Sequence, residues 1–220
     1  LGLSTRKNVQ FMWKNNNYES FDHFLEFFSS RNRKNLEKER RKIAEQDLEI
    51  KRFTGNQISL DVVDDFYSFY VDTHLRRSGH SGYLNKDFFE ETTQTIADNI
   101  LIILAYKNGQ AVAGSFFFYD QNNLYGRYWG ASNDFDALHF ECCYYQGIDF
   151  CIEKNIKRFD PGVQGEHKIK RGFEPTFTFS SHWIENHDFS LAISDFLLRE
   201  DKYIKDYHQD ATTLLPFKNI

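Results

Sequence analysis

The feature that most constrains the fold is a run of three short apolar segments separated by tight polar turns. The first, Ile100–Tyr106, is rich in β-branched residues, and the second, Gln110–Tyr119, follows it after Asn108-Gly109. An Asn-Gly pair between two apolar runs is the strongest short-range hairpin signal. A third run, Leu124–Trp129, follows a second polar turn. The sequence therefore predicts three successive antiparallel strands.

Hydrophobic periodicity predicts helices and further strands on both sides of this run. The segment 137–155 is apolar on nearly every side, which is typical of a buried helix, and Asp134 or Asp136 is placed to cap it. The remaining predicted elements are a strand at 8–13, helices at 21–28 (opened by Ser20) and 31–44, a strand at 48–53, helices at 61–75 and 86–97, a strand at 157–159, a Gly-rich loop at 161–172, a strand at 176–184 and a helix at 189–203 capped by Asp188.

From Leu48 onward, the predicted order is strand, two helices, three antiparallel strands, long helix, strand, loop and strand. This is the order of elements in a GNAT (acyl-CoA N-acyltransferase) domain. We therefore expect an α+β fold with a mixed, mostly antiparallel sheet flanked by helices. Residues 48–220 are predicted to form the GNAT-like domain, and residues 1–47 a preceding strand and helical linker.

Composition is that of an ordinary globular protein. Charged residues make up 27% of the chain and the formal net charge is −5, which argues against a general nucleic-acid binder. Cys142, Cys143 and Cys151 form no CxxC pair and no disulfide framework, so we expect reduced, buried thiols. The apolar runs are too short to span a bilayer. We expect a cytoplasmic protein without a transmembrane segment.

The segment Arg31–Lys42 holds seven basic and two acidic residues, a local charge of +5 within an acidic chain. At helical spacing, Arg31, Lys34 and Lys38 lie along one face. Such a stripe can hold a phosphate-rich partner, such as a tRNA or a nucleotide-linked precursor. A solvated helix laced by i,i+4 ion pairs explains the same pattern. The first interpretation makes these three residues substrate-binding.

A turn motif follows the third predicted strand. GNAT enzymes bind the pyrophosphate of acyl-CoA in a [Q/R]-x-x-G-x-[G/A] loop, where backbone N–H groups at a helix N-terminus face the phosphates. Arg127-x-x-Gly130-x-Ser132 matches the Arg and the first Gly and departs at the last position. The acidic residues Asp134 and Asp136 follow where phosphate would approach. The motif predicts Arg127 as an anion ligand and leaves CoA binding open.

Two polar residues stand near the start of the long apolar helix, His139 and Glu141. An acid near a helix N-terminus is favoured by the helix dipole. A carboxylate in apolar surroundings also has a raised pKa and makes a usable general base. We therefore predict that Glu141 is a candidate general base, and that His139 is either a substrate ligand or a packing residue.

The segment Asp160–Phe173 gives the strongest signal of a site in the sequence, because it follows a predicted strand and contains three glycines. Glycines permit tight turns and close approach of backbone to a ligand. Glu166 and His167 can exchange protons, and Lys168 and Arg171 can clamp a carboxylate or phosphate. A solvated charged turn is the alternative. We further predict that the side chains of Glu141 and His167 approach within one water-bridged contact, with Arg127 facing the same cavity.

Metal and nucleotide-loop chemistry is not indicated. The eight His lack HxxxH spacing, and no GxSxG elbow, Walker loop or GxGxxG is present. We expect no metal and no tightly bound cofactor.

Several motifs together resemble the FemAB-like peptidoglycan biosynthesis/recognition family, and the resemblance covers almost the whole chain. One departure is Met12, where the family pattern has His. The motifs are Gln10–Asn15, Tyr18–Leu25, Ser30–Lys34 with Glu39-Arg40, Leu124–Gly130, Leu138–Glu141 with Tyr144–Ile148, and Gln164–Lys168 with Arg171–Phe173.

The resemblance implies a GNAT-superfamily protein with two GNAT-like halves, of which this chain holds the second half and a linker helix. It implies transfer of an acyl or aminoacyl group from an activated donor to an amine. Acyl-CoA or aminoacyl-tRNA is the expected donor, and the N-terminal half of the same protein is an expected partner. The better-understood Fem relatives use aminoacyl-tRNA and a peptidoglycan precursor.

Three functional hypotheses follow. The first is an N-acyltransferase in which Glu141 or Glu166, with His167, takes the amine proton. The second is a non-catalytic recognition module that binds a cell-wall or nucleotide-linked ligand in the same cleft. The third, a nucleic-acid-binding protein built on the basic helix, is disfavoured by the overall acidity.

Overall fold

The computed structural model of the protein describes residues 2–163 and 165–218, so Gln164 of the quoted motif lies outside the described residues. The chain divides into two compact units, residues 14–162 and residues 1–13 with 163–220. This division differs from the sequence-based boundary at residue 48, which stays a prediction.

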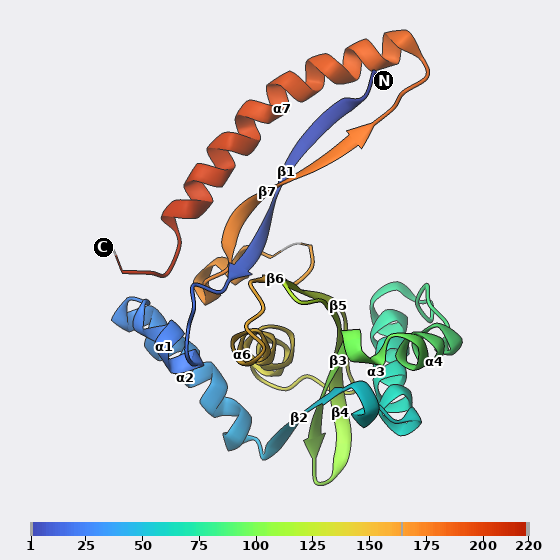
Figure 1. Ribbon diagram of the computed structural model, residues 1–220, viewed down its shortest axis with the longest axis vertical. Coiled ribbons are helices and arrows are strands. Elements are labelled where there is room, and N and C mark those ends of the chain that lie inside the picture. The colour runs from blue at the N-terminus through green and yellow to red at the C-terminus, as the bar shows by residue number, and fades with distance from the viewer. Residues whose placement is uncertain (1, 164, 219–220) are drawn as a thin grey trace. The chain divides into compact units, whose positions relative to one another are not determined.

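The larger unit is built on a sheet in which β2, β3, β4, β5 and β6 are neighbours in that order (Figure 1). The first four strands pair antiparallel, and β6 runs parallel to β5. The predicted mixed, mostly antiparallel sheet is therefore confirmed. The strands are β2 (Leu48–Thr54), β3 (Ile100–Lys107), β4 (Gln110–Tyr119), β5 (Asn123–Ala131) and β6 (Arg158–Asp160).

Helices cover both faces of this sheet: α3 and α4 lie on one face and α6 on the other (Figure 1). The segment that leads into α6 contains a π-helical turn, Glu141–Tyr145. The helices of this unit are α1 (Phe21–Glu26), α2 (Ser30–Glu45), α3 (Leu60–Ser78), α4 (Lys86–Thr95), α5 (Leu138–Phe140) and α6 (Gln146–Glu153), with short 3-10 turns at Gly55–Gln57 and Ala97–Asn99.

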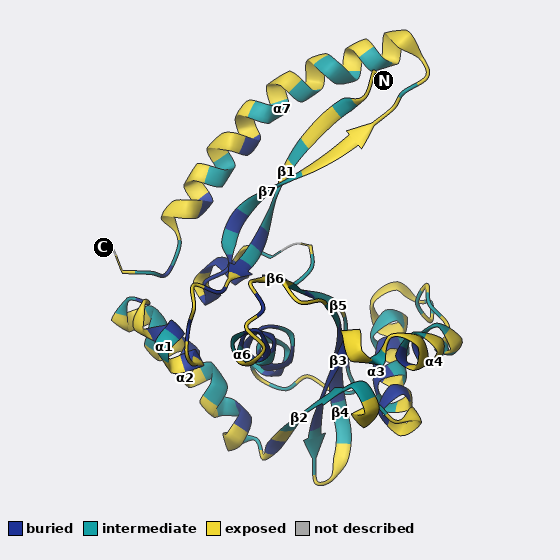
Figure 2. Cartoon of the chain, viewed as in Figure 1, coloured by how far each residue is buried: buried dark blue, intermediate teal, exposed yellow. Residues whose placement is uncertain are grey.

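The core lies on both sides of β3. Residues 100–105 of this strand are all buried, because helices cover both faces of the sheet and the strand has no solvated side (Figure 2). On the α3 side, Phe66, Phe89 and Phe116 meet edge-on or tilted, with ring centroids 5.3–5.5 Å apart. Aromatic pairs in this geometry add to the free energy gained by burial.

The predicted caps need correction at two helices. Neither Asp134 nor Asp136 caps the long helix: the N-cap position is Ala137, in left-handed backbone (φ 64) and without a side-chain cap. Asp136 instead accepts a hydrogen bond from Lys42 at 2.5 Å. At the C-terminal helix the cap is Asn186, which accepts from the Phe189 N–H, and not the predicted Asp188. At the C-terminal helix several polar residues are adjacent, and sequence pattern does not rank them as caps; the long helix instead begins after a left-handed residue, which no side chain caps.

The smaller unit pairs β1 (Ser4–Lys14) antiparallel with β7 (Glu174–His182), in register from Ser4↔His182 to Met12↔Glu174. A long helix, α7 (His187–Thr213), packs along this pair. Ion pairs tie helix to strand: Arg6 lies 2.6 Å from Glu200, and Lys7 lies 2.5 Å from Asp201. A 3-10 helix, Glu166–Arg171, occupies the predicted Gly-rich loop.

The three cysteines are free thiols, as expected, with Cys142 and Cys151 buried and Cys143 half-buried. Burial raises the pKa of the Cys142 and Cys151 thiols well above the usual range. None of the described helices combines the length and the apolar character needed to cross a bilayer.

Candidate functional site

The cleft predicted from the sequence is placed at the point where β5 loses its parallel partner. β6 pairs with Asn123, Leu124 and Tyr125, and the register ends at Tyr125↔Asp160. The chain then turns away through Gly162, in left-handed backbone (φ 89). Residues 126–131 of β5 continue with β4 alongside. Ligands of open sheets bind where neighbouring parallel strands diverge.

Arg127 is the extra residue of a β-bulge at this point. In the β4–β5 register, Phe116 pairs with Tyr128 and Phe117 with Gly126, so Arg127 has no opposite residue. Bulges re-aim side chains and are frequent beside active sites. The bulge gives Arg127 a structural reason to point away from the regular alternation of the strand.

The Arg127 guanidinium is oriented by its neighbours. Nη1 donates to the Gly126 carbonyl at 2.9 Å, and Nη2 lies 3.6 Å from the Asp160 carboxylate. The guanidinium also lies 5.1 Å from the centre of the Tyr125 ring. The side chain is about one third exposed, so an anion can still reach it.

Backbone N–H groups of the predicted pyrophosphate loop are already hydrogen-bonded. The Ala131 N–H donates to Thr73 Oγ1 at 3.3 Å, and the Ser132 N–H donates to the Val112 carbonyl at 2.8 Å. Gly130 is explained by packing: a Cβ there would lie 2.1 Å from the Phe69 carbonyl oxygen of α3. The geometry of this segment therefore does not favour a bound pyrophosphate.

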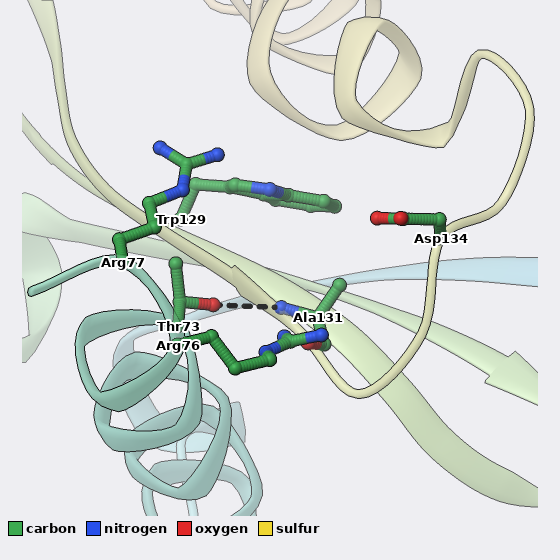
Figure 3. A pocket seen from close by; sticks show the side chains of 6 residues that line it. All are labelled: Thr73, Arg76, Arg77, Trp129, Ala131 and Asp134. Carbon is green, nitrogen blue, oxygen red and sulfur yellow. Dashed lines mark hydrogen bonds between the residues drawn. The ribbon is translucent and has the colours of Figure 1, made fainter. Parts of the chain in front are cut away.

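A cavity of about 240 Å³ opens between the last turns of α3 and the end of β5 (Figure 3). Arg127, Glu141 and His139 are not among the described residues that line it. Its lining residues are Thr73, Arg76, Arg77, Trp129, Ala131 and Asp134.

Glu141 is buried, with 5% of its side chain exposed, and is held in an ion pair. Arg40 Nη2 lies 3.0 Å from Glu141 Oε1 and 2.7 Å from Asp149 Oδ2. Gln146 donates to the same Glu141 oxygen at 2.8 Å. The other oxygen, Oε2, is buried without a hydrogen-bond partner among the described residues. A proton acceptor is thus present, but an arginine already occupies one oxygen.

The charges of this cluster are set by burial and by each other. Burial disfavours a charged Arg40, but the attraction of Glu141 and Asp149 outweighs it and raises the pKa of Arg40. For Asp149, burial dominates over the attraction of Arg40 and raises the pKa of the carboxyl. The Arg40 guanidinium also lies 4.4 Å from the centre of the Phe21 ring, a cation–π contact.

Glu141 opens the π-helical turn, which adds one residue to the helix. The Gln146 N–H bonds to the Glu141 carbonyl, five residues back. Inside the turn, the Cys142 carbonyl accepts a hydrogen bond from the buried Ser115 hydroxyl of β4 at 2.9 Å. Such π-turns occur frequently at functional sites.

His139 lies in an aromatic cluster. Its ring is 5.4 Å from that of Trp129 and 5.4 Å from that of Tyr144, edge-on in both cases. The sequence left two roles open for His139, packing and substrate binding. The structure shows the packing contacts, and the substrate-binding role stays a prediction.

The basic helix exposes the predicted stripe. Arg31, Lys34 and Lys38 are exposed on α2. Nearby basic residues take the i,i+4 pairs expected of a solvated helix: Arg33 with Glu37 at 3.8 Å and Arg41 with Glu45 at 3.4 Å. The exposed residues remain available to an anionic partner. The ion pairs of Arg33 and Arg41 agree with the alternative interpretation, a solvated helix.

The Gly-rich loop residues divide into exposed and buried ones. Glu166 and His167 are exposed, and Glu166 Oε1 accepts a hydrogen bond from the Tyr207 hydroxyl at 2.9 Å. Lys168 and Arg171 are buried, and Arg171 donates to the His167 carbonyl at 2.8 Å. A wholly solvated charged turn is therefore wrong for these two cations.

The predicted pairing of Glu141 with His167 joins the larger unit to the smaller one. It stays a prediction, as do the roles of Glu166, Lys168 and Arg171 in one cleft with Arg127.

Sequence reasoning did not predict the cavity residues Arg76, Arg77 and Trp129 as site residues. Two arginines in the last turn of a helix are explained by the helix dipole alone, so they carried no separate signal. Arg40 was also missed, although it lies at i+4 from the buried Leu36 and three residues before the buried Ile43. That spacing could have shown that Arg40 faces inward.

A protein-family model described as FemAB-like, peptidoglycan biosynthesis/recognition, matches residues 1–219. No curated protein matches the chain.

Three solved structures are similar in fold. The C-terminal domain of a protein assigned as a lysylphosphatidylglycerol synthetase from Agrobacterium fabrum has a TM-score of 0.60 at 12% identity, over 90% of this chain and 66% of that one. L-PGS from Bacillus licheniformis has a TM-score of 0.57 at 14% identity, over 99% and 68%. FemX has a TM-score of 0.56 at 11% identity, over 83% and 63%. The chain thus spans about two thirds of the length of these structures.

The fold of the larger unit agrees with the predicted GNAT-like order, and the family match extends over both units. The chain therefore belongs to the FemAB-like family.

Proposed function

We propose that the protein is a GNAT-superfamily N-acyltransferase or aminoacyltransferase, which moves an acyl group from an activated donor to an amine in cell-wall or lipid biosynthesis. Membership of the FemAB-like family supports this proposal. So does the likeness in fold to L-PGS and FemX. We place the reaction in the cytoplasm, where aminoacyl-tRNA and acyl-CoA are made.

The observation that carries the proposal is the divergence of β5 and β6 beside the bulged Arg127. The pairing of β6 with β5 ends at Tyr125, and Arg127, two residues further along β5, has a side chain that is about one third exposed. In the proposed reaction, the amine attacks the donor carbonyl, a C–N bond forms, and the bond to the donor's leaving oxygen or sulfur breaks. A base takes the amine proton, and Arg127 stabilises negative charge on the donor.

Glu141 is our candidate base, through its unpartnered Oε2. Its Oε1 is held by Arg40 and Gln146, which fixes the carboxylate and leaves the other oxygen as acceptor. Glu166 with His167 is the alternative base. Lys168 and Arg171 are proposed to bind the anionic group of the donor or the acceptor.

For the donor we favour aminoacyl-tRNA over acyl-CoA. The Ala131 and Ser132 N–H groups, which a CoA pyrophosphate would need, are bonded within the protein. The exposed stripe of Arg31, Lys34 and Lys38 suits a polyanion such as tRNA.

A recognition module without turnover is the second candidate. The ion pair of Glu141 with Arg40 favours it, because Arg40 and Gln146 already occupy one oxygen of this carboxylate, as they would in a purely structural contact. The family description names recognition beside biosynthesis.

A transfer assay separates the two candidates. The protein is incubated with labelled aminoacyl-tRNA or acyl-CoA and a panel of amines, and product formation is followed over time. Turnover that is lost in Glu141→Gln, with folding and donor binding retained, supports the transferase. Donor binding without turnover in the wild type under all conditions supports the recognition module.

A further inference from the structure

The cavity between α3 and β5 combines residues of the predicted pyrophosphate loop segment, Trp129, Ala131 and Asp134, with α3 residues that the sequence did not single out. At about 240 Å³ it is smaller than the roughly 300–1,000 Å³ of drug-sized sites, so it suits a compact ligand. Its walls come from the last turns of α3, the end of β5 and the following loop (Figure 3).

The α3 wall is cationic, and its two arginines differ in their contacts. Arg76 donates to the Ala131 and Ser132 carbonyls, which ties α3 to the end of β5. Arg77 has no ion pair or hydrogen-bond partner among the residues that the structure describes, and it lines the cavity beside Trp129 (Figure 3). A guanidinium in this position is available to a carboxylate or a phosphate.

The opposite side is aromatic and acidic. The Trp129 indole forms one wall, and the His139 ring packs edge-on against it at 5.4 Å. The Asp134 side chain points into the cavity toward that indole (Figure 3) and has no ion pair among the described residues. An indole with a nearby carboxylate is a favourable environment for an ammonium group.

We infer that this cavity binds a compact zwitterionic amine, with its ammonium group at Asp134 and Trp129 and its carboxylate or phosphate at Arg77. A ligand of one charge sign would leave the opposite side chain unpaired, whereas a zwitterion pairs both. This inference rests on the proposed function, because it names the chemical class of the amine that the transferase takes up. None of the candidate catalytic residues is among the described residues that line the cavity, so the cavity is inferred to be a binding site for this amine apart from the reacting groups.

The ligand probes form matched sets. An ω-amino acid series from β-alanine to 6-aminohexanoate carries both charges at increasing separation. O-Phosphoethanolamine replaces the carboxylate by a phosphate. Hexylamine lacks the anion, and N-acetyl-6-aminohexanoate lacks the ammonium. Calorimetry gives the dissociation constants, and the Trp129 indole N–H resonance, assigned with Trp129→Phe, reports on the location.

The protein variants are Arg77→Gln and Asp134→Asn, both at exposed positions, where substitution is expected to leave folding intact. Their matched controls are Arg199→Gln and Asp195→Asn, an exposed pair on α7 outside the cavity. Loss of one charged contact is expected to weaken zwitterion binding by about tenfold or more. Arg77→Gln should leave hexylamine binding unchanged, and Asp134→Asn should leave N-acetyl-6-aminohexanoate binding unchanged.

Zwitterion binding that shifts the Trp129 signal and weakens in both cavity variants, with the controls unaffected, supports the inference. Whichever of O-phosphoethanolamine and the ω-amino acids binds more tightly shows whether the site prefers a phosphate or a carboxylate. Absence of binding by every zwitterion overturns the inference, even where the wild type is an active transferase. Binding without any transfer activity upholds the cavity and defeats the proposed function instead.

Discussion

Arg40 on α2 holds Glu141 at the first residue of the π-helical turn, with Nη2 3.0 Å from Glu141 Oε1. The same nitrogen lies 2.7 Å from Asp149 on α6. One arginine therefore joins α2 to Glu141 of the π-helical turn and to Asp149 of α6. The contact couples the position of the candidate base to the docking of α2.

Arg40→Met is expected to destabilise the protein by about 3 kcal/mol, because it leaves two carboxylates in a largely buried place without their counter-charge. Urea unfolding followed by circular dichroism measures the change. The double variant Arg40→Met with Glu141→Gln should recover part of the loss. Equal losses in the single and double variants would show that the charge pair is not the cause. Arg41→Met, on the exposed face of α2, is the matched control.

Ser115→Ala is expected to cost about 1–3 kcal/mol, since it removes the hydroxyl that donates to the buried Cys142 carbonyl inside the π-turn. Ser115→Cys keeps a weak donor and should lose less. Unfolding measurements give the cost, and amide exchange at Gln146 reports on the turn itself. Unchanged exchange at Gln146 in Ser115→Ala would mean that the turn persists without this hydroxyl.

The strands were predictable because their signals are local. Asn108-Gly109 has positive φ at both residues and joins β3 to β4, as the dipeptide predicts. The π-turn was not predictable: the helix is apolar on nearly every side, so an inserted residue leaves no break in periodicity.

The cavity could not be predicted for a different reason. It depends on how closely α3 crosses β5 at Gly130, which brings Arg77 and Trp129 to one place although they are 52 positions apart in the sequence. Neither residue lies in a motif with a spacing that indicates this contact. In contrast, the exposure of Arg31, Lys34 and Lys38 followed directly from helical spacing.

Gly130→Ala is expected to destabilise the protein by about 3 kcal/mol or to prevent folding, because the added Cβ would meet the α3 backbone at Phe69. Gly109→Ala is the control: nothing lies near its Cβ position, so its cost is limited to the strain of a positive φ, about 1 kcal/mol. Thermal unfolding of both variants tests the comparison. A Gly130→Ala variant as stable as Gly109→Ala would contradict the close packing of α3 on β5.

Reversal of the exposed charges on α2, in a variant with Arg31, Lys34 and Lys38 all changed to Glu, is expected to weaken the proposed binding of tRNA and to reduce its salt dependence. Filter binding between low and physiological salt measures both quantities. The control reverses Arg199, Lys202 and Lys218 in the smaller unit, which changes the net charge equally. Equal weakening by both sets would indicate a general charge effect and not a site on α2.

Tyr207 links the alkaline stability of the smaller unit to Glu166. Burial, and then the hydrogen bond to Glu166, raise the pKa of Tyr207 to about 12 from its ordinary value of 10.0. Because the folded-state pKa is the higher one, this contribution to stability is fully present below about pH 10 and is lost as pH rises through about 12. Tyr207→Phe should therefore lose stability at neutral pH and show a smaller decline above pH 10.

Glu166→Gln tests the cause of this shift, because it keeps an acceptor oxygen and removes the charge. The pKa of Tyr207 should fall toward 10 without reaching it, since burial remains. Phenolate absorbance, as the difference between each protein and its Tyr207→Phe counterpart, gives the titration, and circular dichroism separates it from unfolding. Glu185→Gln is the exposed control. If Glu166→Gln leaves the titration of Tyr207 unchanged, the Tyr207 hydroxyl does not donate to Glu166. The Glu166 carboxylate would then be more accessible to a substrate as a base.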